Sequence, residues 1–474
     1  MAPAVNRDHD DLAPHTAISA LSPLPAALAE QKNRCGDIDN CRTLAGIVTS
    51  CLGTIFACIW VAVHKNMPGP EQSWVSVQIE SLKVIIVTLL VPEWVLAWAV
   101  RQFLRAQEIA TELERTRLSA ATSEGGSGVK RKAGNNGDGG NERHDDQIQL
   151  LGKPQTSESV AERLIFSVEQ WDLEKQLGRV NQSWTIVHGF FIIMGGFYNY
   201  RDGEPTFPSA FGDVIKFVKS RTLVPPTADE LGDRSKGDTL SKTVAVLQTL
   251  WFITQCIARR AQGMAITNLE IMTLAYTVLT VAMYAAWWHK PLNVRCPVRV
   301  KGDAPRELRD HYFRWTRGID YVTGDQDYGI NLREHDRVPT FWSDCHSGQV
   351  SKIPLQADII ALSVAMVFGA VHCAAWPYAF PSPTEKALWR ASALTITAIP
   401  VPMAAAFAMF DPFGATGVGN PNLSAKMAIY CMALGGLLYI PARVVLLALS
   451  LSTLRNLPLS AFQTVQWTTF VPHI

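Results

Sequence analysis

Long apolar runs separated by polar loops dominate the pattern of this chain. The central run, residues 247–294, reads as two apolar helices joined by a short polar hinge. The second helix is apolar except for polar residues alternately three and four positions apart, which share one helical face. These residues are Glu270, Thr273, Thr277, Thr280, Tyr284 and Trp287. Because lipid cannot solvate a carboxylate, we expect this face to lie against protein or water.

Further apolar runs approach the roughly 20 residues that cross a bilayer. Pro92 interrupts one of them and should kink it, which frees a backbone carbonyl one turn earlier. Residues 184–200 are shorter, aromatic and rich in glycine, which favours a re-entrant or interfacial segment. The runs cover residues 44–63, 83–100, 357–378, 388–409 and 426–449. Together with the two helices of the hairpin 243–294, they make seven candidate spans.

The predicted fold class is therefore all-α, a polytopic transmembrane helical bundle of about seven spans plus one re-entrant or interfacial segment. Basic residues concentrate in the loops 101–242 and 289–356. The positive-inside rule then places both loops on the cytoplasmic side. The short hinge with Arg259 and Arg260 would then lie on the external side of the membrane, which counts against this topology. If residues 184–200 also crossed, there would be eight spans, and loop 289–356 would move outside with its arginines.

The same pattern divides the chain into segments. Stretches of low complexity and high polarity cannot bury a core and are expected to be mobile. In chain order the segments are a disordered tail 1–43, two spans in 44–100, a cytoplasmic loop 101–183 with a linker at 119–160, the short segment 184–200, a polar loop 201–242, the central hairpin 243–294, a cytoplasmic loop subdomain 295–356, three spans in 357–454 and an amphipathic tail 455–474.

Composition supports a membrane protein. Of the 474 residues, 48% are hydrophobic and 18% are charged, whereas soluble proteins carry about a quarter charged residues. The net charge of +1 gives no overall field that would attract nucleic acid. We therefore expect an integral, multi-pass protein with the lipid bilayer as its surroundings. The sequence leaves open the oligomeric state and the choice between endomembrane and plasma membrane.

Ionisable side chains within the spans are the candidates for chemistry. A mid-span carboxylate costs about 2.5–3.5 kcal/mol on insertion scales, so Glu93 needs a compensating partner. Arg443 could pair with Glu93 or with Glu270, and such a pair could either lock helices together or line a cavity. As a catalytic set, we consider the two glutamates as acid and base and Arg443 as their partner. His188 and His372 complete the set.

Several functional classes fit these residues. An embedded acid can protonate an alkene or epoxide, and aromatic faces can stabilise the resulting cation. This would be a membrane-embedded cyclase or isomerase acting on a hydrophobic small molecule, a lipid or an isoprenoid. The alternative is a transporter, channel or seven-span sensor with a buried Glu–Arg coupling cluster. A scaffold without chemistry is a third class.

Motifs for metals and cofactors are missing from the sequence. There is no P-loop, HExxH motif or paired-aspartate motif in a span, and none of the nine cysteines has the C-x-x-C spacing of a zinc or redox site. We therefore predict no metal and no cofactor. Cys35 with Cys41, and Cys296 with Cys345, could form disulfides if they were luminal.

Short motifs along the chain resemble a large, uncharacterised family of fungal multi-pass membrane proteins. The resemblance covers most of the chain from about residue 40 onward. It implies a fungal origin and a polytopic fold, brings no established activity, and suggests secondary-metabolite biosynthesis only by association. The motifs are PEWVLAWAVRQ at 92–102, HGFFIIMGGF at 188–197, DRSKGD at 233–238, LEIMTLAY at 269–276, WWHKP at 287–291, FGAVHCAAWPYAFPS at 368–382 and WTTFVPHI at 467–474.

Overall fold

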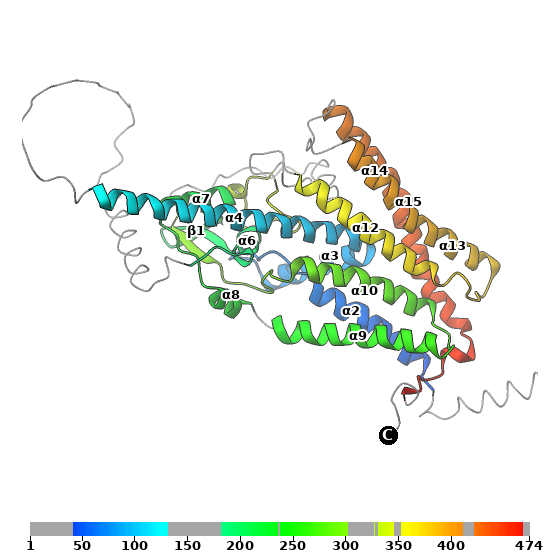
Figure 1. Cartoon of the computed structure of the whole chain (residues 1–474). Coiled ribbons are helices and arrows are strands. Elements are labelled where there is room, and N and C mark those ends of the chain that lie inside the picture. Colours follow the sequence, from blue (N-terminus) through cyan, green and yellow to red (C-terminus); the bar gives the residue numbers. More distant parts are fainter. Residues whose placement is uncertain are drawn as a thin grey trace, which may run out of the picture.

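Long helices lie side by side along much of the molecule, and a small sheet lies at one end, as the computed structural model shows (Figure 1). The structure describes residues 41–130, 182–235, 238–301, 327, 330–345, 352–410 and 421–467. The long helices are α2 (Leu44–Ala62), α3 (Trp74–Leu90), α4 (Pro92–Lys130), α9 (Asp238–Ala261), α10 (Asn268–Trp287), α12 (Ile353–Cys373), α13 (Pro383–Ala398), α14 (Pro400–Phe410) and α15 (Pro421–Ser452).

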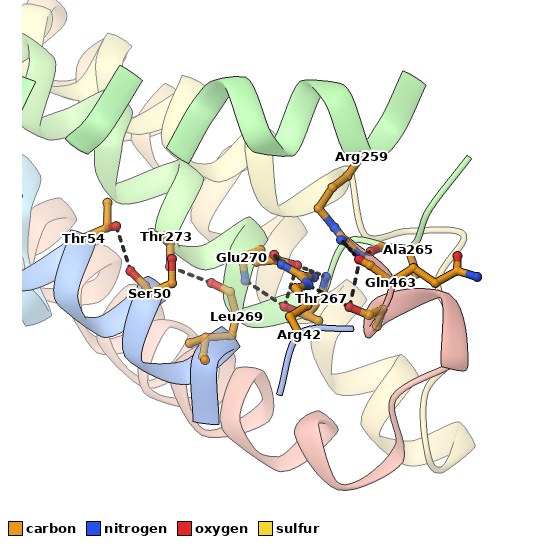
Figure 2. Close-up of polar contacts among 12 residues, drawn as sticks. Arg42, Ser50, Thr54, Arg259, Ala265, Thr267, Leu269, Glu270, Thr273 and Gln463 are labelled. Carbon is orange, nitrogen blue, oxygen red and sulfur yellow. Dashed lines mark hydrogen bonds and ion pairs between the residues drawn. The ribbon is translucent and has the colours of Figure 1, made fainter. Parts of the chain in front are cut away.

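Helix α10 lies at the centre of the bundle and contacts α2, α4, α9, α12 and α15. All six residues of its polar stripe are buried. The threonines satisfy their hydroxyls within the helix, as Thr273 does by donating to the Leu269 carbonyl at 2.8 Å (Figure 2). The polar stripe therefore faces protein. Its threonine hydroxyls need no solvent, whereas the buried Tyr284 hydroxyl has no hydrogen-bond partner among the described residues.

Five of the described helical segments are long and apolar enough to cross a membrane, and the bent pair α3–α4 would add a sixth. Many large apolar side chains on these helices are exposed, including Phe56 of α2, Ile79 of α3 and Leu437 of α15. An apolar outer surface around a bundle with buried polar groups is the inverse of a soluble protein. The five segments are Leu44–Ala62, Asn268–Trp287, Ile353–Cys373, Pro383–Met409 and Tyr430–Asn456.

A break at Pro92 divides the expected span 83–100 into two helices. Helix α3 ends at Leu90, α4 begins at Pro92, and their axes are bent by 113°. Proline has no N–H to continue the helical ladder, so the turn before it loses hydrogen bonds. The Leu89 carbonyl instead accepts the Tyr276 hydroxyl of α10. The expected kink is therefore present, but the run is not one continuous helix.

A three-stranded sheet corrects the expectation of an all-α fold. Strand β1 (Phe197–Arg201) pairs antiparallel with β2 (Glu204–Pro208) and parallel with β3 (Val298–Lys301). The turn between β1 and β2 is Asp202–Gly203, with φ of 55° and 89°, and Asp-Gly favours such a tight hairpin turn. Because β1 and β3 belong to different loops of the sequence, the sheet joins the two loops at one end of the bundle.

Residues 184–200 fold as a short helix and a strand, and their expected re-entrant or interfacial position in a membrane stays a prediction. They form α6 (Ile186–Ile193) and most of β1, and both elements are buried against the rest of the chain. Gly189 of α6 lies so close to α4 that a Cβ there would be 2.2 Å from the Ala106 carbonyl oxygen. The remaining short helices at this end are α7 (Phe211–Lys219), α8 (Ala228–Arg234) and the 3-10 turn η3 (Leu332–Glu334).

The two ends of the described chain meet, although a disordered tail was expected through residue 43. The Arg42 amide donates to the Phe462 carbonyl at 2.8 Å, and Cys41 forms a β-bridge with Gln463. The C-terminal segment contains the 3-10 turns η4 (Thr453–Asn456) and η5 (Leu459–Ala461). Helix α4 also extends into the expected linker, as far as Lys130. Residues 1–40 and 131–160 lie outside the described residues.

Candidate functional site

Arg443 of α15 occupies the break between α3 and α4. Its guanidinium lies 3.4 Å from the Glu93 carboxylate, 3.1 Å from the Tyr276 hydroxyl and 3.4 Å from the Leu89 carbonyl. Its carbon Cζ also lies 4.3 Å from the centre of the Phe368 ring. Arg443 is therefore the partner of Glu93, and it also donates to a carbonyl in the last turn of α3, just before the break.

The space around this group is small. A cavity of about 10 Å³ lies beside Arg443 and His372, which is about the volume that one water molecule requires. His372 is fully buried, with Nδ1 2.9 Å from the Phe368 carbonyl and Nε2 3.4 Å from the Met272 sulfur. The structure thus brings Glu93, Arg443 and His372 into one group that can hold a charge or a proton and has no room for a lipid.

Glu270 belongs to a different group, at the N-terminus of α10 (Figure 2). One carboxylate oxygen lies 2.6 Å from the Arg42 guanidinium, and the other accepts the Thr267 amide at 2.7 Å. Thr267 in turn accepts the Glu270 amide, so the two residues form a capping box at the N-terminus of α10. The expected alternative of a Glu270–Arg443 pair is therefore wrong, and Glu270 caps its helix.

Arg259 completes the Glu270 end of the bundle. Its guanidinium donates to the carbonyls of Gln463 at 2.6 Å, Ala265 at 2.7 Å and Ser460 at 3.0 Å (Figure 2). Arg42 donates to the Ala461 carbonyl at 2.9 Å. Only 1% of Arg259 is exposed, and the side of the membrane on which this hinge lies stays a prediction. The two arginines together fasten the C-terminal segment to the bundle.

His188 has a structural position on α6. Its Nδ1 accepts the Thr185 amide at 3.0 Å, so its other nitrogen, Nε2, carries the proton and donates to the Pro226 carbonyl at 2.8 Å. Burial lowers the pKa of His188, which favours this neutral form. His188 therefore caps α6 and ties it to the segment before α8, and its hydrogen-bond partners lie outside the Glu93–Arg443 group.

Comparison with protein families covers almost the whole chain. The sequence model of a family of unknown function, DUF8562, matches residues 18–138, 153–313 and 306–474. The chain belongs to the DUF8562 family. No curated protein matches it, and no solved structure does. This membership agrees with the resemblance to an uncharacterised family, and the fungal origin stays a prediction.

Sequence reasoning missed a buried lysine in this DUF8562 chain. Only 1% of Lys290 is exposed. Its Nζ donates to the His64 carbonyl at 2.5 Å, the Gln102 side chain at 2.8 Å and the Asn66 side chain at 3.1 Å.

The surroundings of Lys290 suit an ammonium group. Burial lowers the pKa of Lys290 well below its usual value, but three acceptors match its three N–H donors. The rings of Trp98 and Trp287 lie 4.9 and 5.1 Å from Nζ and add cation–π stabilisation. No carboxylate is among its partners in the described part of the chain. In the sequence, the only signal for this site is the pair Trp287–Trp288 just before Lys290, and of these two Trp287 contacts the ammonium group.

A second buried charge cluster joins α4 to α12. Arg101 donates twice to the Asp358 carboxylate, at 2.7 and 2.9 Å, and both side chains are less than 10% exposed. Arg105 donates to the Asp344 carbonyl at 2.7 Å. Burial raises the pKa of Asp344 to about 7 although Arg105 opposes the shift. Both arginines, at the start of the basic loop 101–242, are buried inside the protein.

Neither Cys296 nor Cys345, one of the two pairs considered for a disulfide, is bonded to another cysteine. Cys296 is exposed and Cys345 is buried. Burial raises the pKa of the Cys345 thiol to about 12, which keeps it protonated. The proposed Cys296–Cys345 pair is therefore wrong, and Cys35 of the other pair lies outside the described residues.

His64 gives the fold a pH dependence. Burial lowers its pKa from 6.5 to about 3, and Lys242 and Lys290 add to the shift. Because the unfolded chain binds the proton more tightly, stability is highest above pH 6.5 and falls as the pH drops toward 3. We expect a slope of up to about 1.4 kcal/mol per pH unit from this residue, measured by denaturant unfolding in detergent. H64Q should flatten the profile and the exposed control H289Q should not, so an unchanged slope in H64Q would contradict this assignment.

Proposed function

We propose that this protein is a multi-pass membrane transporter in which the Glu93–Arg443 pair couples a proton or an ionic group to helix movement. The observation that carries the proposal is a helix broken at Pro92, with a buried ion pair at the break. Discontinuous helices with charged groups at the break are typical of substrate and ion sites in transporters. Ionisable residues inside a membrane are expensive and usually functional.

The outer surface of α9 supports a seven-span arrangement. This helix is less apolar overall than the five spans, but its large apolar residues face outward. A lipid-facing side explains such a stripe, since water would oppose it. With the bent pair α3–α4 and α9, the five apolar segments would make seven spans. The exposed residues of α9 are Leu240, Val244, Val246, Leu247, Leu250, Trp251 and Ile257.

The geometry at the break suits a reversible contact. The Arg443–Glu93 distance of 3.4 Å is longer than the 2.7–2.9 Å or so of a tight charge-assisted hydrogen bond. Tyr276 and Leu89 hold Arg443 independently of the carboxylate. Protonation of Glu93, or an anion bound by Arg443, would therefore release α4 from α15 without leaving the guanidinium unpaired. The pair therefore has two states, in contact and released, and a proton gradient or a bound cargo can shift the equilibrium between them.

The cyclase or isomerase hypothesis stays a prediction. It requires an apolar cavity next to a protonated acid. Beside Arg443 and His372 the described residues leave about 10 Å³, and Glu270 is committed to its helix cap. These observations favour the transporter over the enzyme.

Metabolite profiling of cells and medium separates the two classes. A heterologous host would express wild type, E93Q or the exposed control E71Q, with an empty vector beside them. Transport predicts a changed distribution of existing compounds between cells and medium, lost in E93Q and kept in E71Q. An enzyme predicts new masses. Profiles for wild type and E93Q that match the empty vector would reject both for the compounds that host supplies.

A further inference from the structure

A cavity of about 410 Å³ lies away from the Glu93–Arg443 group, between the first turns of α3, the connector that follows α2, and two loop segments. Its polar lining includes Lys65 from the connector, Ser81 from α3, Arg295 from the loop after α10, and Arg337 and Thr340 from the loop after η3. These segments are far apart in the sequence, so the fold itself builds the concave surface. The volume is within the range of small-molecule sites.

The charges of this cavity are not balanced. Its one carboxylate, Glu80, is already bound by Lys83 at 3.3 Å, Arg337 at 3.4 Å and the Thr340 hydroxyl at 3.1 Å. Lys65 donates to the Ser81 hydroxyl, a neutral partner. Among the residues that the structure describes, Arg295 forms no hydrogen bond or ion pair. Glu80 also attracts Lys65, but among the described residues of the lining three cations face this one carboxylate, so the cavity keeps an excess of positive charge.

Lys65 and Arg295 act on each other electrostatically. Burial lowers the pKa of Lys65, and the nearby positive charge of Arg295 lowers it further. Placing two like charges at one partly buried site is unfavourable unless an anion binds between them. The arrangement therefore favours a negatively charged ligand group.

An apolar extension continues from the cationic part of the cavity. A second cavity of about 70 Å³ shares Trp60, Lys65 and Ser81 with the first. It continues past Ile59 of α2 and Ile85 of α3. The outer surfaces of these two helices are apolar here, with Trp60 51% and Leu82 57% exposed. A ligand with an anionic end could thus place an apolar chain along α2 and α3.

We propose that this combined cavity binds an anionic amphiphile, with its phosphate or carboxylate head between Lys65 and Arg295 and its apolar chain between α2 and α3. Charge-assisted hydrogen bonds from two cations hold the head, and burial of the chain adds the hydrophobic contribution. The site is independent of the Glu93–Arg443 pair, so it can be tested whether or not the protein is a transporter. The ligand is either a lipid of the membrane or a free amphiphile.

Dodecyl phosphate is a suitable probe for the full chain purified in a neutral detergent. It should raise the melting temperature of the wild type in a concentration-dependent way. R295Q and K65Q should weaken its Kd about tenfold or more, because each removes one charged hydrogen-bonding partner. Lys83 lies on the same helix and is bound to Glu80, but it does not line the cavity. K83Q therefore makes the same charge change and should leave the Kd unaltered.

Inorganic phosphate tests whether the apolar extension contributes. It should bind at least about tenfold more weakly than dodecyl phosphate, because it fills only the polar part of the cavity. Equal binding of the two probes, or a loss in K83Q equal to the loss in R295Q, would overturn the proposal. Arg295 is exposed, so R295Q should keep the melting temperature of the ligand-free protein.

Native mass spectrometry of the purified protein distinguishes the two sources of ligand. An anionic phospholipid retained by the wild type and lost from R295Q would identify a membrane lipid. A wild type that binds dodecyl phosphate but retains no lipid would identify a free amphiphile. Both results support the proposed chemistry. A wild type that neither retains an anionic lipid nor binds dodecyl phosphate contradicts it.

Discussion

Replacing Arg443 with methionine is expected to lower the free energy of unfolding by about 3–5 kcal/mol, because it leaves Glu93 charged and buried without its partner. The change also removes the donors to the Leu89 carbonyl and the Tyr276 hydroxyl. The measurement is denaturant unfolding of the purified protein in detergent, followed by the fluorescence of its tryptophans. The same variant should show a lower yield of folded protein from membranes.

The double variant E93Q/R443M separates a broken ion pair from a lost packing contact. Removing both charges should recover part of the stability, because no uncompensated charge remains. Arg455 provides the control, since it binds Glu385 at 2.6 Å but its side chain is 63% exposed. R455M should cost no more than about 1 kcal/mol. A double variant that loses the sum of the two single losses would show that the pair contributes through packing alone.

Replacing Lys290 with methionine is the second change with a large expected effect. Methionine fills a similar volume but leaves the buried His64 carbonyl without the Lys290 donor. The Asn66 and Gln102 side chains each lose one hydrogen bond but keep another donor, Gln102 and Trp287 respectively. Because a buried unsatisfied group costs about 1–3 kcal/mol, we expect a loss of that size. The measurement is the unfolding free energy at neutral pH.

Removal of the Lys290 ammonium also changes the local environment of two tryptophans. Trp98 and Trp287 lose the cation above their rings in K290M, so their fluorescence spectrum should shift in the folded state. K83M, at an exposed lysine of α3, should change neither the stability nor the spectrum. Wild-type stability in K290M would mean that the His64 carbonyl finds another donor.

Sequence reasoning succeeded where the physical cause is local. The absence of an N–H on Pro92 predicts a break whatever surrounds it, and α3 does end two residues before it. The alternation of polar residues along α10 likewise fixes one face, and that face is buried. The cost of a charge within a span predicts a partner for Glu93, and Arg443 provides it.

The errors concern partners that only the folded chain brings together. Glu270 pairs with Arg42, which lies in a segment expected to be disordered. Lys290 depends on Asn66 and Gln102, and no spacing in the sequence connects these three residues. The hairpin of the sheet had a local signal at Asp202–Gly203, but the apolar, aromatic composition of residues 184–200 favoured a re-entrant or interfacial segment over a strand. The parallel partner β3 of strand β1 lies beyond the hairpin α9–α10 and could not be identified from the sequence.

The contacts of Arg42 and Arg259 constrain the order in which the protein can mature during synthesis. Both arginines donate to carbonyls of the C-terminal segment, and Arg42 and Ala461 are 419 positions apart. Until the ribosome has made that segment, both guanidiniums lack these acceptors. Nascent chains that stop before η5 should therefore remain recognisable to membrane quality control as incomplete, since two cations at one end of the bundle stay uncovered. Residues 460–463 are thus needed to complete the end of the bundle at which α2 begins.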